Sequence, residues 1–135
     1  MRNRIFVDTL FVVALTNKRD QYYQKALQLA KQYENHPFIT TDAILLEVGN
    51  ALSGNCRNES VALIESFLAS DDVEVIRLTP QLFDQAFSFY KKHEDKSWGL
   101  VDCVSFVVMQ QNNVTQALTF DRHFIQAGFQ ALMRD

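Results

Sequence analysis

Short apolar segments alternate with longer segments of helical periodicity along the whole chain, and this alternation limits the fold more than any other sequence feature. Segments rich in apolar and β-branched residues predict strands at 4–7, 38–40, 73–77 and 116–120, with 129–133 as a candidate last strand. Helical spacing of apolar residues predicts helices at 22–34, 42–52, 59–69, 81–93, 98–111 and 122–127. Short strands that alternate with helices form parallel sheets covered on both faces. The sequence therefore predicts an α/β fold with a short, mainly parallel central sheet flanked by helices on both faces.

The chain has the length and composition of one folded domain. Its 135 residues, 47% of them hydrophobic, are enough to surround one core, so we expect a single domain over residues 1–135. The formal net charge of −3 argues against nucleic-acid binding through a broad basic face, although it leaves a local site open. Cys56 and Cys103 are too few for a disulfide framework, which favours a reducing compartment.

Two apolar stretches need to be distinguished from export and membrane signals. Asp8 interrupts the apolar segment that follows Arg2 and Arg4, and no small-residue cleavage site comes after it. The uncharged stretch 103–120 contains adjacent glutamine and asparagine side chains at 110–113, whose amides would be costly in hydrocarbon. We therefore expect a cytoplasmic protein without a membrane segment.

Four carboxylates stand where the surrounding sequence is apolar. Asp8 and Asp121 directly follow predicted strands, at the sheet edge where α/β folds bind ligands. Glu47 lies inside the predicted helix 42–52, and Asp102 is the only charged residue of another apolar helical segment. Segments of this kind are built for burial, so each charge needs an explanation.

Helix capping is the alternative interpretation for three of these acids. An aspartate at a helix start accepts hydrogen bonds from free backbone N–H groups, which suits Asp8 and Asp121. Asp102 could act as a cap near Gly99 only if its helix begins late, and Glu47 lies too far inside its helix to be a cap. In this alternative the four acids lie apart from one another, and each has its own hydrogen-bond or ion-pair partners.

A shared cation would explain all four acids together. A buried carboxylate without a partner costs several kcal/mol, and no Lys or Arg lies within one helical turn of Glu47 or Asp102. Oxygen ligands with few histidines favour Mg²⁺ or Mn²⁺ over zinc. Clustered carboxylates that hold such ions are typical of phosphodiester hydrolysis, in which an ion lowers the pKa of water or stabilises the leaving oxygen.

Other catalytic patterns find little support in the sequence. A phosphatase of the haloacid dehalogenase type would need a second Asp two residues after the first, where Leu10 stands. Ser105 and Cys103 have no neighbouring base, and there is no Gly-rich phosphate loop.

In the order and spacing of these acids the sequence resembles the PIN-domain nucleases, in particular the VapC-like toxins of bacterial toxin–antitoxin pairs. The segments that carry the resemblance are FVDTLFVVAL around Asp8, ITTDAILLEVGNAL around Glu47, and WGLVDCVSFVVMQQNNVTQALTFDRHF around Asp102 and Asp121. Together they cover nearly the entire chain. The resemblance implies a PIN-like fold and a metal-dependent endoribonuclease, with these four acids as catalytic residues and as ligands of Mg²⁺ or Mn²⁺.

The resemblance also implies supporting residues and partners. Thr9 and Thr119 would orient ligands, water or phosphate near the metal. The partners would be an RNA substrate, cut to leave a 5′-phosphate and a 3′-hydroxyl, a cognate antitoxin whose tail covers the active centre, and a second copy of the chain in a homodimer through apolar helices of the N-terminal half.

Two residues depart from the family pattern. Leu10 stands where a small polar residue is frequent, and Val101 stands where Thr or Ser is common. Because hydrogen bonds to metal ligands orient them, both departures motivate an alternative function. This alternative is a catalytically weak or inactive PIN-fold module that binds protein or RNA.

Overall fold

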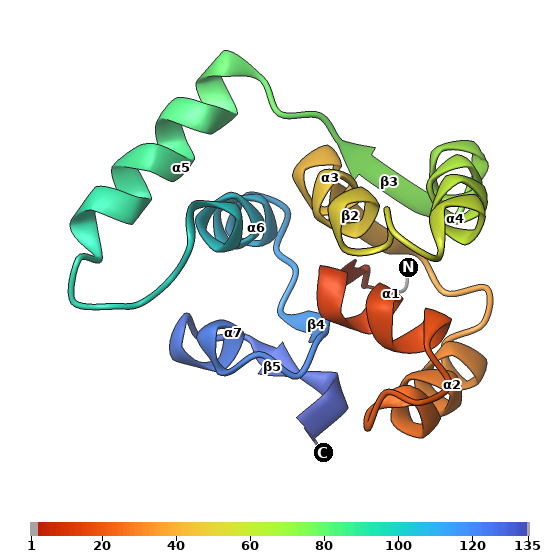
Figure 1. The fold of residues 1–135 in the computed structure, drawn as a ribbon. Helices are drawn as coiled ribbons and strands as arrows, with labels where there is room; N and C mark the ends of the chain where they lie inside the picture. Colours follow the sequence, from red (N-terminus) through yellow and green to blue (C-terminus); the bar gives the residue numbers. More distant parts are fainter. Residues whose placement is uncertain (1–2, 135) are drawn as a thin grey trace.

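The structure, a computed structural model, describes residues 3–134 (Figure 1). The strands of this part of the chain form one five-stranded sheet in the order β3-β2-β1-β4-β5, and every pair of neighbours is parallel. The predicted parallel sheet is confirmed, and β1 lies at its centre. The strands are β1 (Ile5–Val7), β2 (Phe38–Thr41), β3 (Val73–Ile76), β4 (Gln116–Leu118) and β5 (Gln130–Ala131).

Helices cover both faces of the sheet, as predicted. The helices are α1 (Thr9–Thr16), α2 (Tyr23–Gln32), α3 (Asp42–Ala51), α4 (Arg57–Ala69), α5 (Pro80–Lys92), α6 (Leu100–Gln111), α7 (Arg122–Gln126) and a terminal 3₁₀ turn, η1 (Leu132–Arg134). Helices α1, α2 and α4 lie on one side of the strands and α5 to α7 on the other, whereas α3 overlaps β2 in this view (Figure 1). Right-handed crossovers explain this division, because the chain moves outward from β1 to β3 and then returns past β1 to β4 and β5. Within residues 3–134, none of these helices combines the length and apolar character of a membrane span.

Three elements differ from the periodicity-based prediction. Helix α1 was missed because residues 10–15 are apolar without interruption and show no helical stripe. Helix α6 begins at Leu100, so Trp98 precedes it. The predicted strand 129–133 is wrong beyond Ala131, because the chain turns into η1 and the Met133 N–H donates to the carbonyl of Thr119 at 3.1 Å.

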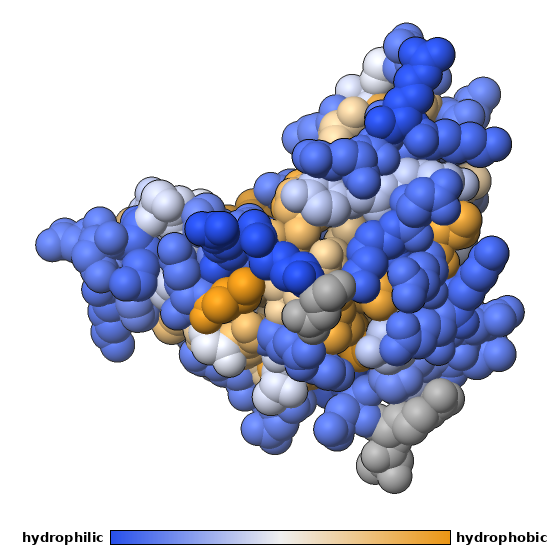
Figure 2. Space-filling model, turned by 90° about the horizontal axis from the view of Figure 1, so that it is seen from below, coloured by the Kyte–Doolittle hydropathy of each residue, from blue (hydrophilic) through white to orange (hydrophobic). Residues whose placement is uncertain are grey.

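An aromatic cluster forms the part of the core between α5, α6 and α7. Phe106 is fully buried, and its ring lies 5.0–6.5 Å, between centroids, from the rings of Phe89, Trp98, Phe124 and Phe129. Apolar side chains also gather in the hollowed middle of the face seen from below, whose outer parts are largely hydrophilic (Figure 2).

Removing the Phe106 ring should lower the free energy of unfolding by about 3–5 kcal/mol, because a large-to-small change in a packed core loses both burial and contacts. The matched control is Phe83→Ala, whose ring is 43% exposed on α5. For the control we expect a loss of less than about 1 kcal/mol. Urea unfolding of both variants measures the difference, and equal losses would contradict this description of the core.

The outer face of α5 is less buried than its sequence predicts. Helical spacing places Leu82, Phe83, Ala86, Phe87 and Tyr90 on one apolar stripe. In the structure Leu82 and Ala86 are buried, whereas the three aromatic rings are 42–43% exposed. Phe83 stacks on Phe87 and Phe87 on Tyr90, with centroid distances of 6.2 and 6.5 Å. The stripe is wider than the surface that the neighbouring helix covers.

The carboxyl ends of β1 and β4 are tied together, and this fixes the position of the residues that follow them. The Asp8 N–H donates to the carbonyl of Leu118 at 3.3 Å. The buried Thr40 hydroxyl, from β2, donates to the carbonyl of Val7 at 2.8 Å. Asp8 and Asp121 therefore start from neighbouring points on one edge of the sheet.

Candidate active site

The four predicted site acids line one cavity of about 500 Å³ at the carboxyl edge of the sheet. Asp8 directly follows β1, Glu47 comes from α3, Asp102 comes from the first turn of α6, and Asp121 directly precedes α7. The other lining residues are Thr9, Leu10, Asn50 and Ala51. The structure thus brings together side chains that are up to 113 positions apart in the sequence.

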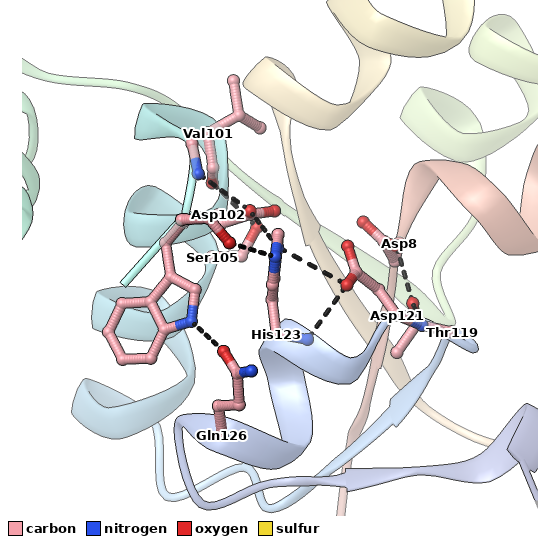
Figure 3. A network of polar contacts seen from close by, with 11 residues as sticks. Asp8, Val101, Asp102, Ser105, Thr119, Asp121, His123 and Gln126 are labelled. Atoms are coloured by element: carbon pink, nitrogen blue, oxygen red, sulfur yellow. Dashed lines mark hydrogen bonds and ion pairs between the residues drawn. The ribbon is translucent and has the colours of Figure 1, made fainter. Parts of the chain in front are cut away.

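Asp8 is the most deeply buried of the four acids, with 5% of its surface exposed. Burial, with smaller contributions from the nearby charges of Asp102 and Glu47, raises the pKa of its carboxyl to about 7. The Thr119 hydroxyl opposes this shift, because it donates to Asp8 Oδ2 at 2.8 Å. The same hydroxyl accepts from the Asp121 N–H at 3.1 Å, so Thr119 links the two strand-end acids (Figure 3).

Glu47 is half-buried on α3 and is held by the second of the predicted supporting threonines. The Thr9 hydroxyl, at the first residue of α1, donates to Glu47 Oε1 at 2.7 Å. Each threonine therefore orients one carboxylate, Thr9 that of Glu47 and Thr119 that of Asp8.

Two of the acids also act as helix caps, so capping and site membership coincide there. Helix α6 begins late enough for the Gly99 N–H to donate to Asp102 Oδ2 at 3.0 Å. The His123 N–H donates to Asp121 Oδ1 at 2.9 Å, at the start of α7. Each cap occupies one oxygen and leaves the second oxygen of the same carboxylate.

His123 completes the group and was missed as a site residue by sequence reasoning. Its Nδ1 lies 3.0 Å from Asp102 Oδ2 and 3.4 Å from Asp121 Oδ1, and its Nε2 lies 3.2 Å from Ser97 Oγ (Figure 3). The signal in the sequence was weak, because His123 lies 21 positions from Asp102 and the sequence pattern does not show at which residue α7 begins.

The donor set fits a hard divalent cation. Asp102, Asp121 and His123 each offer a ligand atom within 4.8 Å of the other two, and Asp8 and Glu47 line the same cavity. The ion pairs of residues 3–134 give the four carboxylates one basic partner, His123, and no Lys or Arg. Burial, and to a lesser extent repulsion from Asp102 and Glu47, disfavours the charge on Asp8, and a bound cation would stabilise that charge.

Comparison with known proteins identifies the family of this fold and cavity. The model of the PIN domain matches residues 5–130. The chain belongs to the PIN-domain family. This PIN protein is 31% identical over 127 residues, 93% of its own chain and 95% of the relative, to the 23S rRNA-specific endonuclease VapC20 of two Mycobacterium tuberculosis strains, CDC 1551 / Oshkosh and H37Rv. It is a VapC-like toxin endoribonuclease, a phosphodiester hydrolase.

Solved structures agree with this assignment. The crystal structure of Mycobacterium tuberculosis VapC20, described as a sarcin–ricin loop cleaving toxin, superposes on this PIN domain with a TM-score of 0.83 at 30% identity, covering 93% of this chain and 95% of that one. The DNA-bound VapBC of Salmonella typhimurium gives a TM-score of 0.64 at 12% identity over 96% and 97% of the two chains. At that identity the second likeness shows the fold.

Proposed function

We propose that this VapC-like protein hydrolyses RNA phosphodiester bonds at the acidic cavity, with Asp8, Glu47, Asp102 and Asp121 holding Mg²⁺ or Mn²⁺. The main support is that four carboxylates from separate elements face one cavity, while burial and neighbouring charges raise the pKa of Asp8 to about 7. When bound, such an ion lowers the pKa of a water molecule and stabilises the leaving oxygen. No covalent nucleophile from the chain is needed.

The chain's own residues contribute orientation and charge. Thr119 holds the Asp8 carboxylate, and Thr9 holds that of Glu47, so the oxygens that face the cavity are fixed before substrate binds. The backbone N–H groups of Gly99 and His123 fix Asp102 and Asp121 in the same way. Fixed ligands avoid reorganisation during the reaction, which is how a preorganised site lowers a barrier.

A loop of ribosomal RNA is the substrate that the relatives favour. VapC20 is named for 23S rRNA, and this chain shares 31% of its residues over nearly its whole length. A second cavity, of about 580 Å³, is lined by Lys91 and Lys96, with Glu94 as an acidic neighbour. Ser97 also lines it and contacts His123, which reaches Asp102 and Asp121 of the acidic cavity. These lysines offer phosphate contacts for an RNA strand that enters the acidic cavity.

An antitoxin and a second copy of the chain are the proposed protein partners, in the cytoplasm. Leu46, beside Glu47 on α3, is 70% exposed, and Val61 and Leu68 on α4 are about half exposed. Leu46 lies one turn of α3 before Asn50, which lines the cavity, and offers an apolar contact to an antitoxin tail that covers the cavity. The α4 side chains suit a homodimer through helices of the N-terminal half.

One observation favours the alternative function, a catalytically weak or inactive PIN-fold module. Leu10 lines the acidic cavity with an apolar side chain, at a place where a polar group could hold a water molecule or a metal ligand.

Cleavage mapping on total RNA and on ribosomes separates these functions. With Mg²⁺ or Mn²⁺ we expect the intact protein to cut one loop of the large ribosomal RNA, and Asp102→Asn to lose the cut, because one fixed carboxylate of the cavity is neutralised. Asp84→Asn, at an exposed acid on α5 outside the cavity, is the matched control and should cut normally. Cuts elsewhere would refute the ribosomal substrate, and no cuts with either metal would favour the interaction module.

A further inference from the structure

We propose that His123 is a third metal ligand beside Asp102 and Asp121, and that its imidazole makes this cavity prefer Mn²⁺ to Mg²⁺. This inference rests on the proposed function, because it concerns the same ion. It adds a residue outside the four acids and a selectivity that the acids alone do not give.

The positions of the donor atoms match one corner of a coordination sphere. For metal–ligand bonds of about 2.1 Å, neighbouring ligand atoms of an octahedral ion lie about 3.0 Å apart. His123 Nδ1 lies 3.0 Å from Asp102 Oδ2 and 3.4 Å from Asp121 Oδ1. The three side chains therefore already converge on one point without a change of backbone (Figure 3).

The other ring nitrogen supplies the second, independent observation. Metal-ligating histidines usually donate the N–H of their free nitrogen to an oxygen that fixes the tautomer and the ring. Ser97 Oγ lies 3.2 Å from His123 Nε2 and is placed to accept that hydrogen bond. With the proton on Nε2, the lone pair of Nδ1 faces the two carboxylates, where a cation would sit.

The two carboxylates can bind a cation while keeping their capping bonds. Asp102 Oδ2 accepts the Gly99 N–H and Asp121 Oδ1 accepts the His123 N–H, and each oxygen retains a further lone pair. The start of α7 thus positions both the Asp121 carboxylate and the His123 ring from three consecutive residues.

An imidazole ligand changes which ion the site holds best. Mg²⁺ prefers oxygen ligands and keeps several waters, whereas imidazole suits later first-row ions, and affinity for nitrogen-containing sites rises from Mn²⁺ onward. A site of acids alone would discriminate weakly between Mg²⁺ and Mn²⁺. The same site with His123 should bind Mn²⁺ more tightly.

The competing arrangement is a protonated His123 that donates to both carboxylates and takes the place of the cation. In that case the ring positions the acids and must move away, or stay outside the coordination sphere, when metal binds. The two arrangements differ in whether a nitrogen atom is bonded to the ion.

Pulsed electron paramagnetic resonance of bound Mn²⁺ gives the direct readout, without RNA. We expect a directly bonded ¹⁴N signal in the intact protein, retained in His36→Asn, whose histidine lies beside Asn3, outside the acidic cavity. The signal should disappear in both His123→Ala and His123→Gln. A bound Mn²⁺ without nitrogen coupling in the intact protein would overturn the inference.

Calorimetric titration measures the selectivity in the same variants. His123→Ala should weaken Mn²⁺ binding by about tenfold or more and Mg²⁺ binding by less than about threefold. If both affinities fall equally, or neither changes, His123 is not a selecting ligand, although the acidic site stands. If the intact protein binds neither ion, the proposed function itself fails.

Discussion

Asp8→Asn will abolish RNA cleavage and at the same time stabilise the metal-free protein above neutral pH. The change removes one of the charges that face the cavity, so we expect the cleavage rate to fall by at least about a thousandfold, equivalent to roughly 4 kcal/mol of transition-state stabilisation. Stability should rise because the buried carboxylate, whose pKa is raised to about 7, no longer has to ionise. An asparagine oxygen can still accept the Thr119 hydroxyl.

Two measurements on Asp8→Asn distinguish the loss of a catalytic charge from a general loss of folded protein. Cleavage is followed with a labelled RNA at saturating Mg²⁺ or Mn²⁺, and stability by thermal unfolding with a chelator at pH 8. The matched control is Asp84→Asn, an exposed acid on α5, for which neither quantity should change by much. An Asp8→Asn protein that is inactive and also less stable would show that Asp8 is structural.

Without metal, the intact protein should lose stability as the pH rises from about 4 to about 7. Burial holds the pKa of Asp8 near 7 in the folded state against 3.8 in the unfolded chain, so the folded state binds the proton more tightly. This contribution is fully present below the unfolded pKa and is lost as the pH rises through the folded one. It amounts to roughly 4 kcal/mol over the window.

Metal should reverse this dependence. A dication needs the ionised carboxylate, so the stabilisation by Mg²⁺ or Mn²⁺ should grow between pH 5 and pH 8. Urea unfolding of the intact protein and of Asp8→Asn, each with chelator and with metal, isolates the part that belongs to Asp8. If the two proteins show the same pH profile in chelator, the carboxylate of Asp8 is not the titrating group.

The sequence was informative about the four acids because each stands where its surroundings are apolar. Asp8 and Asp121 follow strands, and parallel strands end at one edge of a sheet, so their proximity could be predicted from topology alone. Glu47 and Asp102 were found as charges on helices built for burial. The catalytic and ligand roles of these residues, like the single domain over the whole chain, stay predictions.

Features that depend on the residue at which a helix begins or on how two helices pack could not be predicted from the sequence. His123 reaches Asp102 only because α7 begins at Arg122, and Ser97 meets His123 across 26 positions of sequence. Periodicity also could not show that α5 buries Leu82 and Ala86 but leaves Phe83 and Phe87 exposed, because that division depends on how much surface α6 offers. Helix α1 could not be predicted for a related reason. Its sequence is continuously apolar, so no alternation of polar and apolar residues shows the helical periodicity.

The hydrogen bond between Thr119 and Asp8 joins residues 111 positions apart. During translation, a chain that has emerged only as far as α6 carries three of the four carboxylates but lacks the strand beside β1 that completes the cavity. Such a chain lacks Asp121 and the Thr119 hydroxyl that holds Asp8, so its acidic cavity is incomplete. The cavity is completed only when β4 and α7 have emerged and β4 has paired with β1.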